Sequence, residues 1–413
     1  MHTSPRAIVV GAGFAGLSTA TILLDEGVGV TVLEARERVG GRVWSTTLTN
    51  GAIVELGAEW IMAGNSAVRE AAARFGIPLV ETGASYGRRE PWGHGAASLE
   101  AQSAFIAAAA ATRASLARAD AAATSVGEFL EGVEGDDAAR SIVMRRLAGT
   151  CAQDLGRVSL ASFGDEAFAS TTGDRYFRAG PGNQAIALAM AARVPDLRLG
   201  HAVDAVTAGP DAVTVHVGSH AEPAEAVVVA VPAPIAARLS FSPALPDDVA
   251  TAIGGLPMGE AAKFAVVTKQ RPSIRSRQSS ALSMWCWSAK GTGGKARRCV
   301  ASFAGSRPAL EALGVTRGEV APWLDALREM NPDVTFEGEP VLYAWADDPY
   351  TLGAYSAWDS ASWARRDAFA RPVGRIAFAG EHTAGDDHHG TMEGALRSGR
   401  RAAEQVLASL ARR

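Results

Sequence analysis

The segment "IVVGAGFAGLSTATILLDEGVGVTVLEARERVGGRVW", Ile8 to Trp44, decides the fold. An apolar run leads into the pattern Gly11-x-Gly13-x-x-Gly16, which is followed by apolar residues at helical spacing. In such a strand–turn–helix unit the first glycine makes the turn and the second lets a pyrophosphate approach the backbone. The third lets the helix pack against the strand. The free N–H groups at the helix start favour phosphate, so the segment predicts a dinucleotide site.

The continuation of this segment distinguishes between two cofactor classes. A second apolar run ends at Glu34, whose carboxylate at the strand tip can accept hydrogen bonds from ribose hydroxyls. Up to this point nicotinamide and flavin dinucleotides are both open. The chain then brings three cations and two adjacent glycines, Arg36, Arg38, Arg42, Gly40 and Gly41. These residues offer further contacts to a pyrophosphate and a longer ligand, which favours FAD.

The bulk properties are those of a globular protein that does not bind nucleic acid. The chain has 413 residues, which predicts two domains. A net charge of −4 argues against the clustered basic surface that nucleic acids require. Cys151, Cys286 and Cys299 lack metal or disulfide spacing, which favours free thiols in a reducing compartment. Without a recognisable secretory signal or an apolar stretch of about 20 residues, we expect a cytoplasmic protein with no membrane partner.

The stretch "EARERVGGR" resembles the flavin-containing amine oxidase superfamily (monoamine and polyamine oxidase-like), in which E-A-R-x-R-x-G-G-R follows the second strand and binds FAD. Further segments match that family in its order: "VELGAEWI" from Val54, "LPMGEAAKFAVV" from Leu256, "YAWADDPYTLGAYSAW" from Tyr343, and "RIAFAGEHT" followed by "GTMEGALRSGRRAAEQVL" near the C-terminus. The resemblance therefore spans the whole chain.

The resemblance implies an α/β fold, in which a Rossmann-type FAD-binding domain interleaves with an α+β substrate-binding domain. We expect the FAD-binding domain to comprise residues 1–75, 181–250 and 371–413. The substrate-binding domain then comprises residues 76–180 and 251–370. Alanine-rich stretches within the first of these two substrate-domain segments have high helix propensity and predict helices.

The resemblance also implies which residues contact the FAD. Ala58, Glu59 and Trp60 lie nearest the isoalloxazine ring, the backbone of Val203 contacts the adenine, and the Met392 N–H points toward the N1/O2 edge. The expected cofactor-binding set is Gly11, Gly13, Ala15, Gly16, Glu34, Ala35, Arg36, Gly41, Arg42, Ala58, Glu59, Trp60, Val203, Gly380, Glu381 and Met392.

Three residues are the expected catalytic set. Lys263 stands in an otherwise apolar strand, where a lysine is either buried for a purpose or reaches solvent at a strand edge. In the family, the matching lysine hydrogen-bonds a water beside flavin N5. Trp345 matches a tryptophan packed near the flavin. Tyr355 matches one half of the aromatic cage around the substrate amine, and Thr391 takes the second, substrate-binding position, which is a tyrosine in monoamine oxidases.

The activity implied is FAD-dependent oxidation of the C–N bond of a small amine by hydride transfer to flavin N5. The products are an imine, which hydrolyses to a carbonyl compound, and hydrogen peroxide formed from dioxygen. A site with aromatic walls favours the neutral amine by desolvation. The sequence leaves open which amine is used, whether dioxygen is the acceptor, and whether the chain forms a homodimer.

Three rival functions are considered. In amino-acid oxidases an arginine shortly after the "LG" motif pairs with the substrate carboxylate, but "LGAEWIMAGNS" contains none before Arg69. A C–C desaturase or porphyrinogen-type oxidase shares the FAD motifs, and Lys263 and Tyr355 argue against it. The third is a non-catalytic FAD protein, whose flavin no amine would reduce.

The stretch "GDDHHG" contains four side chains that can ligate metals, Asp386, Asp387, His388 and His389. Adjacent histidines on a loop rarely converge on one ion without further partners, so we expect no metal site. A polar rim that attracts a cationic amine and a solvated loop remain as interpretations of this segment.

Ala354 makes a prediction about how the flavin is held. In monoamine oxidases, a cysteine at the matching position carries the covalent bond to the flavin, and alanine cannot form that bond. Denaturing the flavin-loaded protein should therefore release all of the FAD into the supernatant, measured by its absorbance after filtration. Flavin that stays with the polypeptide would refute non-covalent binding.

Overall fold

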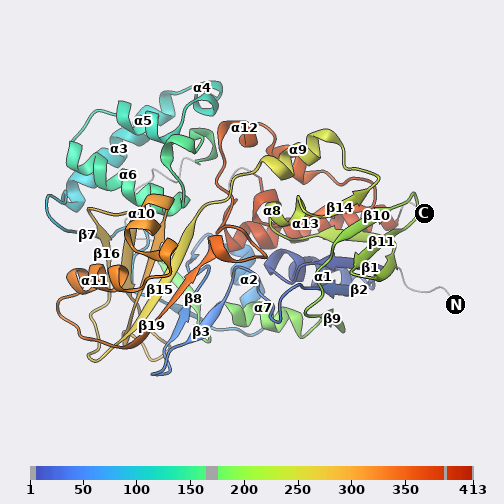
Figure 1. Cartoon of the computed structure of the whole chain (residues 1–413), viewed down its shortest axis with the longest axis horizontal. Coiled ribbons are helices and arrows are strands. Elements are labelled where there is room, and N and C mark those ends of the chain that lie inside the picture. Colours follow the sequence, from blue (N-terminus) through green and yellow to red (C-terminus); the bar gives the residue numbers. More distant parts are fainter. Residues whose placement is uncertain (1–5, 164–174, 386–387, 412–413) are drawn as a thin grey trace.

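The centre of the nucleotide-binding half is a parallel five-stranded sheet (Figure 1). The computed structural model describes residues 6–163, 175–385 and 388–411. In the sheet, β1 lies between β2 and β13, and all neighbouring strands pair in parallel. From one edge to the other the strands are β20 (Ile376–Phe378), β13 (Ala226–Val229), β1 (Arg6–Val10), β2 (Gly29–Leu33) and β9 (Asp196–Arg198).

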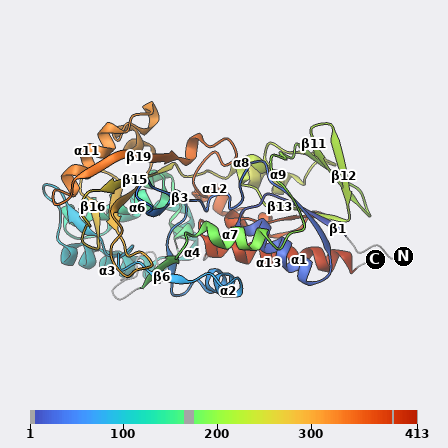
Figure 2. The same cartoon turned by 90° about the horizontal axis from the view of Figure 1, so that it is seen from below.

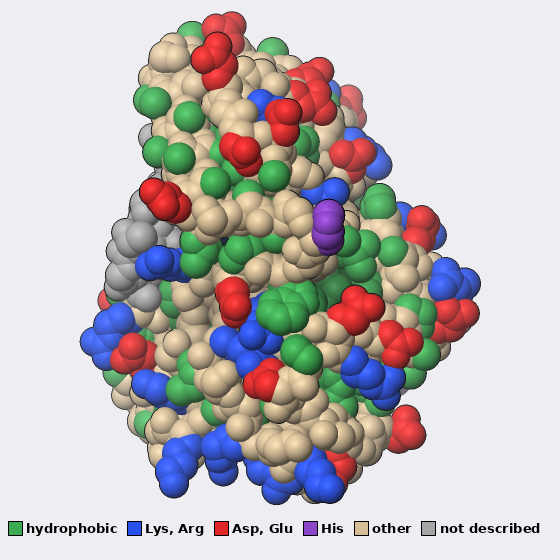
Figure 3. Space-filling view, turned by 90° about the vertical axis from the view of Figure 1, so that its left-hand side faces the viewer, with side chains coloured by type: hydrophobic (Ala, Val, Ile, Leu, Met, Phe, Trp, Pro, Cys, Tyr) green, Lys and Arg blue, Asp and Glu red, His purple; other side chains and the backbone are tan. Residues whose placement is uncertain are grey.

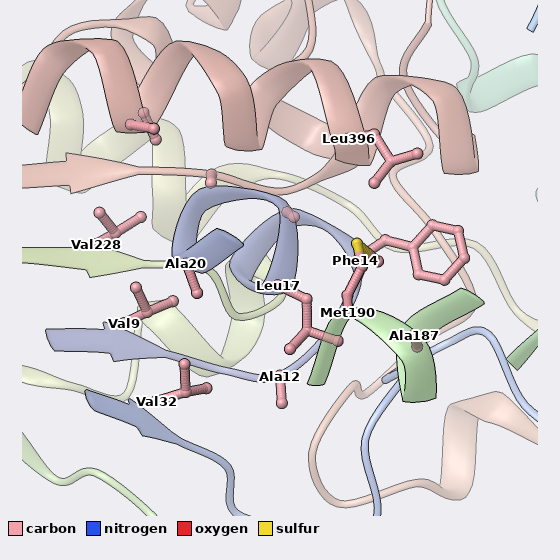
Figure 4. Close-up of a cluster of buried hydrophobic side chains, with 14 of the residues drawn as sticks. Val9, Ala12, Phe14, Leu17, Ala20, Val32, Ala187, Met190, Val228 and Leu396 are labelled. Atoms are coloured by element: carbon pink, nitrogen blue, oxygen red, sulfur yellow. The ribbon is translucent and has the colours of Figure 1, made fainter. Parts of the chain in front are cut away.

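Two helices from opposite ends of the chain cover one face of this sheet. The helix α1 (Phe14–Asp25) follows the glycine turn, and α13 (Met392–Leu410) packs against it. Figure 4 shows Leu17 of α1 and Leu396 of α13 in the same apolar cluster as the valines of the strands. The Ser18 hydroxyl donates to the Leu396 carbonyl, 3.0 Å away. The C-terminal segment thus completes a core that the N-terminal segment begins.

A second, four-stranded sheet covers the opposite face. Its strands, in order, are β12 (His220–Ala224), β11 (Val213–Val217), β10 (Ala205–Ala208) and β14 (Ser240–Ser242). Val206 and Val215 pack in one buried cluster with Ile8 and Val10 of β1. A strand that is buried on both faces needs a continuous apolar run, and this explains the sequence at Ala7–Val10.

The other half of the molecule is built on a six-stranded sheet, which both views place at the end away from α1 (Figures 1 and 2). Its strands, in order, are β19 (Phe336–Ala344), β15 (Ala261–Thr268), β18 (Cys299–Gly305), β17 (Met284–Ser288), β16 (Arg275–Ser279) and β7 (Glu90–Trp92). Helices on this half are α3 (Leu99–Ser115), α4 (Arg118–Ala123), α5 (Val126–Gly132), α6 (Asp137–Cys151), α10 (Arg307–Ala312) and α11 (Ala321–Met330).

The remaining α-helices and strands are short. They are β3 (Ser45–Thr47), β4 (Ile53–Glu55), β5 (Ile61–Met62), β6 (Leu79–Glu81), β8 (Tyr176–Ala179), α2 (Ser66–Arg74), α7 (Gln184–Ala191), α8 (Ala233–Ala236), α9 (Asp247–Gly255) and α12 (Ser360–Trp363). The predicted α/β class with interleaved parts is confirmed, and the alanine-rich stretch forms α3. Within the described ranges, no helix is both long and apolar enough to cross a membrane.

The close approach of α13 to α1 makes a prediction about stability. A Cβ added at Gly399 would lie 2.3 Å from the Ala15 carbonyl oxygen. Because this oxygen belongs to the backbone of α1, a side-chain rotation cannot remove the clash. We expect Gly399→Ala to lower the free energy of unfolding by about 1–3 kcal/mol, measured by urea denaturation of the flavin-loaded protein. Gly254→Ala is the control, because this position of α9 is exposed and a Cβ there meets nothing within 4 Å. It should be neutral or stabilising by up to ~1 kcal/mol, and equal losses would contradict the packing argument.

Candidate active site

One cavity of about 860 Å³ extends between the two halves. At one end it is lined by Gly11, Gly13 and Glu34, at the carboxyl ends of β1 and β2. At the other end it reaches Lys263 and Tyr355. Ligands of open parallel sheets bind outside the carboxyl ends of the strands. The cavity therefore joins a dinucleotide site to a second compartment on the six-stranded sheet.

The glycine turn is shaped for a ligand. Gly11 has φ +103°, and a Cβ there would lie 2.9 Å from the Ala230 carbonyl oxygen. A Cβ at Gly16 would lie 1.9 Å from the Gly11 carbonyl oxygen, so this glycine serves helix packing, as the sequence indicates. A Cβ at Gly13 meets no protein atom within 4 Å, and this residue lines the cavity. The turn thus fits the close approach of a pyrophosphate.

Glu34 holds this turn together and also lines the cavity. Its carboxylate accepts hydrogen bonds from the backbone N–H of Ala12 at 2.8 Å and of Arg36 at 2.9 Å. The Arg36 guanidinium pairs with Asp348 and lies over the Tyr350 ring. Arg36 lines the cavity too, whereas Arg38 does not, because its guanidinium packs on the Trp44 ring at 4.3 Å. Two of the three expected cations therefore reach the cavity, Arg36 and Arg42.

Glu381 is a junction between segments that are far apart in the sequence. It pairs with Arg42 at 2.7 Å and accepts hydrogen bonds from Ser356 Oγ at 2.6 Å and the Gly390 N–H at 2.7 Å. Burial alone would raise the pKa of this carboxyl, but Arg42 and the other partners outweigh burial and lower it to about 2. Glu381 is therefore ionised at neutral pH, and it fixes the Arg42 side chain beside the cavity.

Lys263 is buried, which settles one of the alternatives that the sequence left open. It lies on β15, in the interior of the six-stranded sheet between β18 and β19. Its Nζ pairs with Glu59 Oε2 at 3.0 Å and lies 4.6 Å from the centre of the Trp287 ring. Glu59 Oε1 accepts a hydrogen bond from Trp287 Nε1 at 3.0 Å. The ion pair between Glu59 and Lys263 thus joins the segment after β4 to the six-stranded sheet.

Glu59 and a neighbouring buried carboxyl, Glu55, have pKa values that are shifted in opposite directions. Burial opposes ionisation of Glu59, but Lys263 and Arg297 hold its pKa below the ordinary value. At Glu55, burial and then the charge of Glu59 raise the pKa to about 7. Glu55 also hydrogen-bonds Ser45 Oγ at 2.7 Å. Glu59 is therefore ionised in the folded protein, and Glu55 takes up or releases a proton near neutral pH.

The remaining expected active-site residues lie around the same compartment. Trp345 donates from Nε1 to the Leu56 carbonyl at 2.8 Å, and Tyr355 donates from Oη to the Thr150 carbonyl at 2.6 Å. Thr391 caps α13 by accepting from the Gly394 N–H at 3.0 Å. Of the expected cofactor-binding, catalytic and substrate-binding residues, all but Gly16 line the cavity. The residues that do are Gly11, Gly13, Ala15, Glu34, Ala35, Arg36, Gly41, Arg42, Ala58, Glu59, Trp60, Val203, Lys263, Trp345, Tyr355, Gly380, Glu381, Thr391 and Met392.

Part of the "GDDHHG" stretch belongs to this site. His389 lines the cavity, and its Nε2 lies 2.8 Å from the Ser162 carbonyl oxygen. The carbonyl of His388 accepts from the Thr391 hydroxyl at 2.6 Å. Asp386 and Asp387 lie outside the described residues. In the described part of the chain, no group of three or more His, Cys, Asp or Glu side chains is arranged to hold a metal ion.

Arg89 is a cavity residue that the sequence did not indicate. It is 3% exposed, and its guanidinium carbon lies 3.9 Å from the centre of the Trp285 ring. Its other contacts are the Tyr86 carbonyl, which accepts from Nε at 2.8 Å, and Gln278 Oε1, which accepts from Nη1 at 2.9 Å. Gln278 and Trp285 come from β16 and β17, far along the chain, so sequence spacing alone gives no signal for this cluster.

Comparison with known proteins agrees with this geometry. The model of the flavin containing amine oxidoreductases matches residues 14–407. The chain belongs to this family. Polyamine oxidase 3 of Oryza sativa subsp. japonica is 27% identical over 98% of this chain and 89% of its own length. The flavin-containing amine oxidase of Danio rerio is 24% identical over 98% of this chain and 86% of its own length.

Solved structures of amine oxidases share the fold. Cyclohexylamine oxidase from Brevibacterium oxydans superposes with a TM-score of 0.85 at 19% identity, covering 99% of this chain and 100% of the other. Putrescine oxidase bound to putrescine gives 0.81 at 21% identity, covering 98% and 99%. The protein is thus an oxidoreductase of the flavin-dependent amine oxidase family, with a flavin as its cofactor.

The face in Figure 3 carries acidic and basic side chains side by side.

Glu55 makes a prediction about the pH dependence of stability. Its pKa in the folded oxidase is about 7, above an unfolded value of about 4.3. As pH rises through this window the unfolded state loses its proton first, so wild-type stability falls and then levels above pH 7. Glu55→Gln removes this loss, and its stability relative to wild type should increase by up to ~3 kcal/mol between pH 4.5 and 7.5.

Thermal unfolding at a series of pH values measures this difference. Glu134→Gln, at an exposed position, is the matched control. A difference between Glu55→Gln and wild type that stays constant over the pH range would contradict a protonated Glu55.

Proposed function

We propose that the protein binds FAD non-covalently and oxidises the C–N bond of a small amine, with dioxygen as the electron acceptor. The observation that carries the proposal is the single cavity that joins the glycine turn at Gly11–Gly13 to the buried Lys263 on β15. Family membership supports the flavin. When bound, the flavin would accept a hydride, which carries both electrons, from the substrate carbon, and these electrons would reduce dioxygen to hydrogen peroxide together with that hydrogen and the proton released from the amine nitrogen.

The protein's own residues would bind and orient the two partners. The α1 N-terminus and the Gly13 backbone would receive the pyrophosphate, and Glu34 would lie beside the ribose. Arg42, fixed by Glu381, would supply positive charge along the cofactor. Ala58, Glu59 and Trp60 would flank the ring system, and the α13 start at Met392 would favour negative charge at its edge.

The substrate would lie against Tyr355 and the aromatic side chains of the second compartment. The Tyr355 hydroxyl donates to a backbone carbonyl, so its contribution is the ring face and the position of the ring. Trp60 and Trp285 add apolar walls, and the Trp287 ring packs against both of them. Such walls favour the neutral amine, which has the lone pair that oxidation requires. Loss of a hydride from carbon and a proton from nitrogen would turn the amine into an imine, which water hydrolyses to a carbonyl compound and ammonia or a smaller amine.

Lys263 would act through its position. Its ammonium is held by Glu59 at 3.0 Å and stacked on the Trp287 ring, so it can hold a water at a fixed place in the cavity. We further propose that the two sheets are the centres of the FAD-binding and substrate-binding domains with the boundaries given above. The three free cysteines support a reducing, cytoplasmic setting.

Peroxide release on addition of amines tests the proposed reaction. A coupled peroxidase assay with primary, secondary and polyamine substrates should show amine-dependent turnover. A flavin-loaded protein that desaturates a C–C bond, or that has no activity, would release no peroxide with any amine.

Replacing Lys263 tests its role in the two half-reactions. Lys263→Met should slow flavin reduction, reoxidation or both by about 10²-fold, measured separately by stopped-flow spectroscopy. Because the substitution leaves the buried Glu59 carboxylate to the more distant Arg297, at 3.7 Å, Lys263→Met/Glu59→Gln is needed as a variant without the poorly compensated charge. Lys269→Met, at an exposed position, is the control. Unchanged rates in both half-reactions of the double variant would remove Lys263 from the mechanism.

A further inference from the structure

We propose that the preferred substrate is an amine carrying a carboxylate, and that Arg89 binds this carboxylate at the end of the cavity away from Lys263. The inference rests on the proposed amine oxidation and specifies its substrate class. It places the carboxylate several bonds from the reacting carbon, as in an ω-amino acid.

The first observation is an uncompensated cation in the cavity wall. Arg89 lines the cavity and makes no ion pair with a carboxylate of the described residues. Its Nε and Nη1 donate to neutral oxygens, and Nη2 has no hydrogen-bond partner in the described parts of the chain. Burying a guanidinium whose N–H groups are not all hydrogen-bonded costs desolvation free energy, unless a ligand accepts hydrogen bonds from the remaining N–H groups. A carboxylate is the group that best matches this fork of donors.

The surroundings of Arg89 add positive charge and no negative charge. The titratable groups that act on it are Tyr86, Tyr176 and Arg146, and Arg146 is a second cation of the same sign. Burial is the main reason that the pKa values of both arginines are lowered. A bound anion would offset both losses of solvation. This compartment therefore has a field that attracts a carboxylate and repels an ammonium.

The second observation concerns the acidic groups, since a diamine would need one for its distal ammonium. Among the described residues, the acids that line the cavity are Glu34, Glu59, Asp204 and Glu381. Each of them already accepts hydrogen bonds from the protein, and Glu59 and Glu381 are ion-paired. None of these carboxylates lies in the cluster around Arg89. The described lining therefore favours an anionic tail over the second amine of a compound such as putrescine.

The third observation sets the spacing between the carboxylate and the reacting carbon. The Arg89 guanidinium stacks on the Trp285 ring, and the Lys263 ammonium lies over the Trp287 ring. The centres of the Trp285 and Trp287 rings are 4.2 Å apart. Two indole rings thus separate the two cations. A substrate whose amine lies near Lys263 needs a chain of carbons to reach Arg89. This geometry disfavours α-amino acids, whose carboxylate is attached to the reacting carbon.

Flavin reduction by matched substrates tests the proposal. Under anaerobic conditions, 4-aminobutanoate, 6-aminohexanoate, n-butylamine, n-hexylamine, 2-aminobutanoate and putrescine are compared by their reduction rate constant over Kd. We expect at least one ω-amino acid to exceed the alkylamine of equal chain length by about tenfold or more. Arg89→Gln should lower that ratio by 10- to 100-fold, the size of a charged hydrogen bond, and Arg89→Lys should restore part of it. The adjacent exposed Arg88→Gln is matched in charge change and should keep the ratio.

Ligand binding gives a readout that does not depend on turnover. Butanoate and hexanoate should perturb the flavin absorbance of the wild type and bind at least tenfold more weakly to Arg89→Gln. If alkylamines reduce the flavin but no carboxylated amine surpasses them, or if putrescine is best, the carboxylate site is wrong and amine oxidation stands. If 2-aminobutanoate is best, the spacing is wrong. If no amine reduces the flavin, the proposed function itself fails.

Discussion

The buried ion pair between Lys263 and Glu59 is the constraint on which the site depends. Glu59 comes from the segment after the first βαβ unit, and Lys263 comes from the middle of the six-stranded sheet. Neither charge is tolerable alone in this environment, so the pair requires the two halves to meet at one place. The Arg42–Glu381 pair does the same for the N- and C-terminal segments. All four residues of these two ion pairs line the cavity.

Local signals in the sequence were sufficient for the first nucleotide-binding unit. The Gly11–Gly16 turn, the apolar strand that precedes it and the acid at Glu34 are all consecutive features, and the structure has each where the pattern predicts it. The burial of Lys263 was left open, because a single lysine in an apolar strand has the same pattern at an edge or in the interior. Only the pairing of β15 with both β18 and β19 decides it.

What the sequence could not supply are contacts between distant segments. Lys263 and Glu59 were each expected near the flavin, but their ion pair was not, since more than two hundred positions separate them. Arg89 was missed for the same reason: its aromatic partner Trp285 comes from a strand that no motif marks. The absence of an arginine near the "LG" motif argued against an α-amino acid substrate. The folded chain brings a different arginine to the cavity from another direction.

The central claim is that the flavin in this cavity takes electrons from an amine. The most direct measurement is the absorbance of oxidised flavin when an amine is added to the flavin-loaded wild-type protein in the absence of oxygen. We predict that this absorbance is lost when the flavin is reduced in a single turnover and that it returns when dioxygen is admitted. Flavin that stays oxidised with every primary, secondary and carboxylated amine would contradict it.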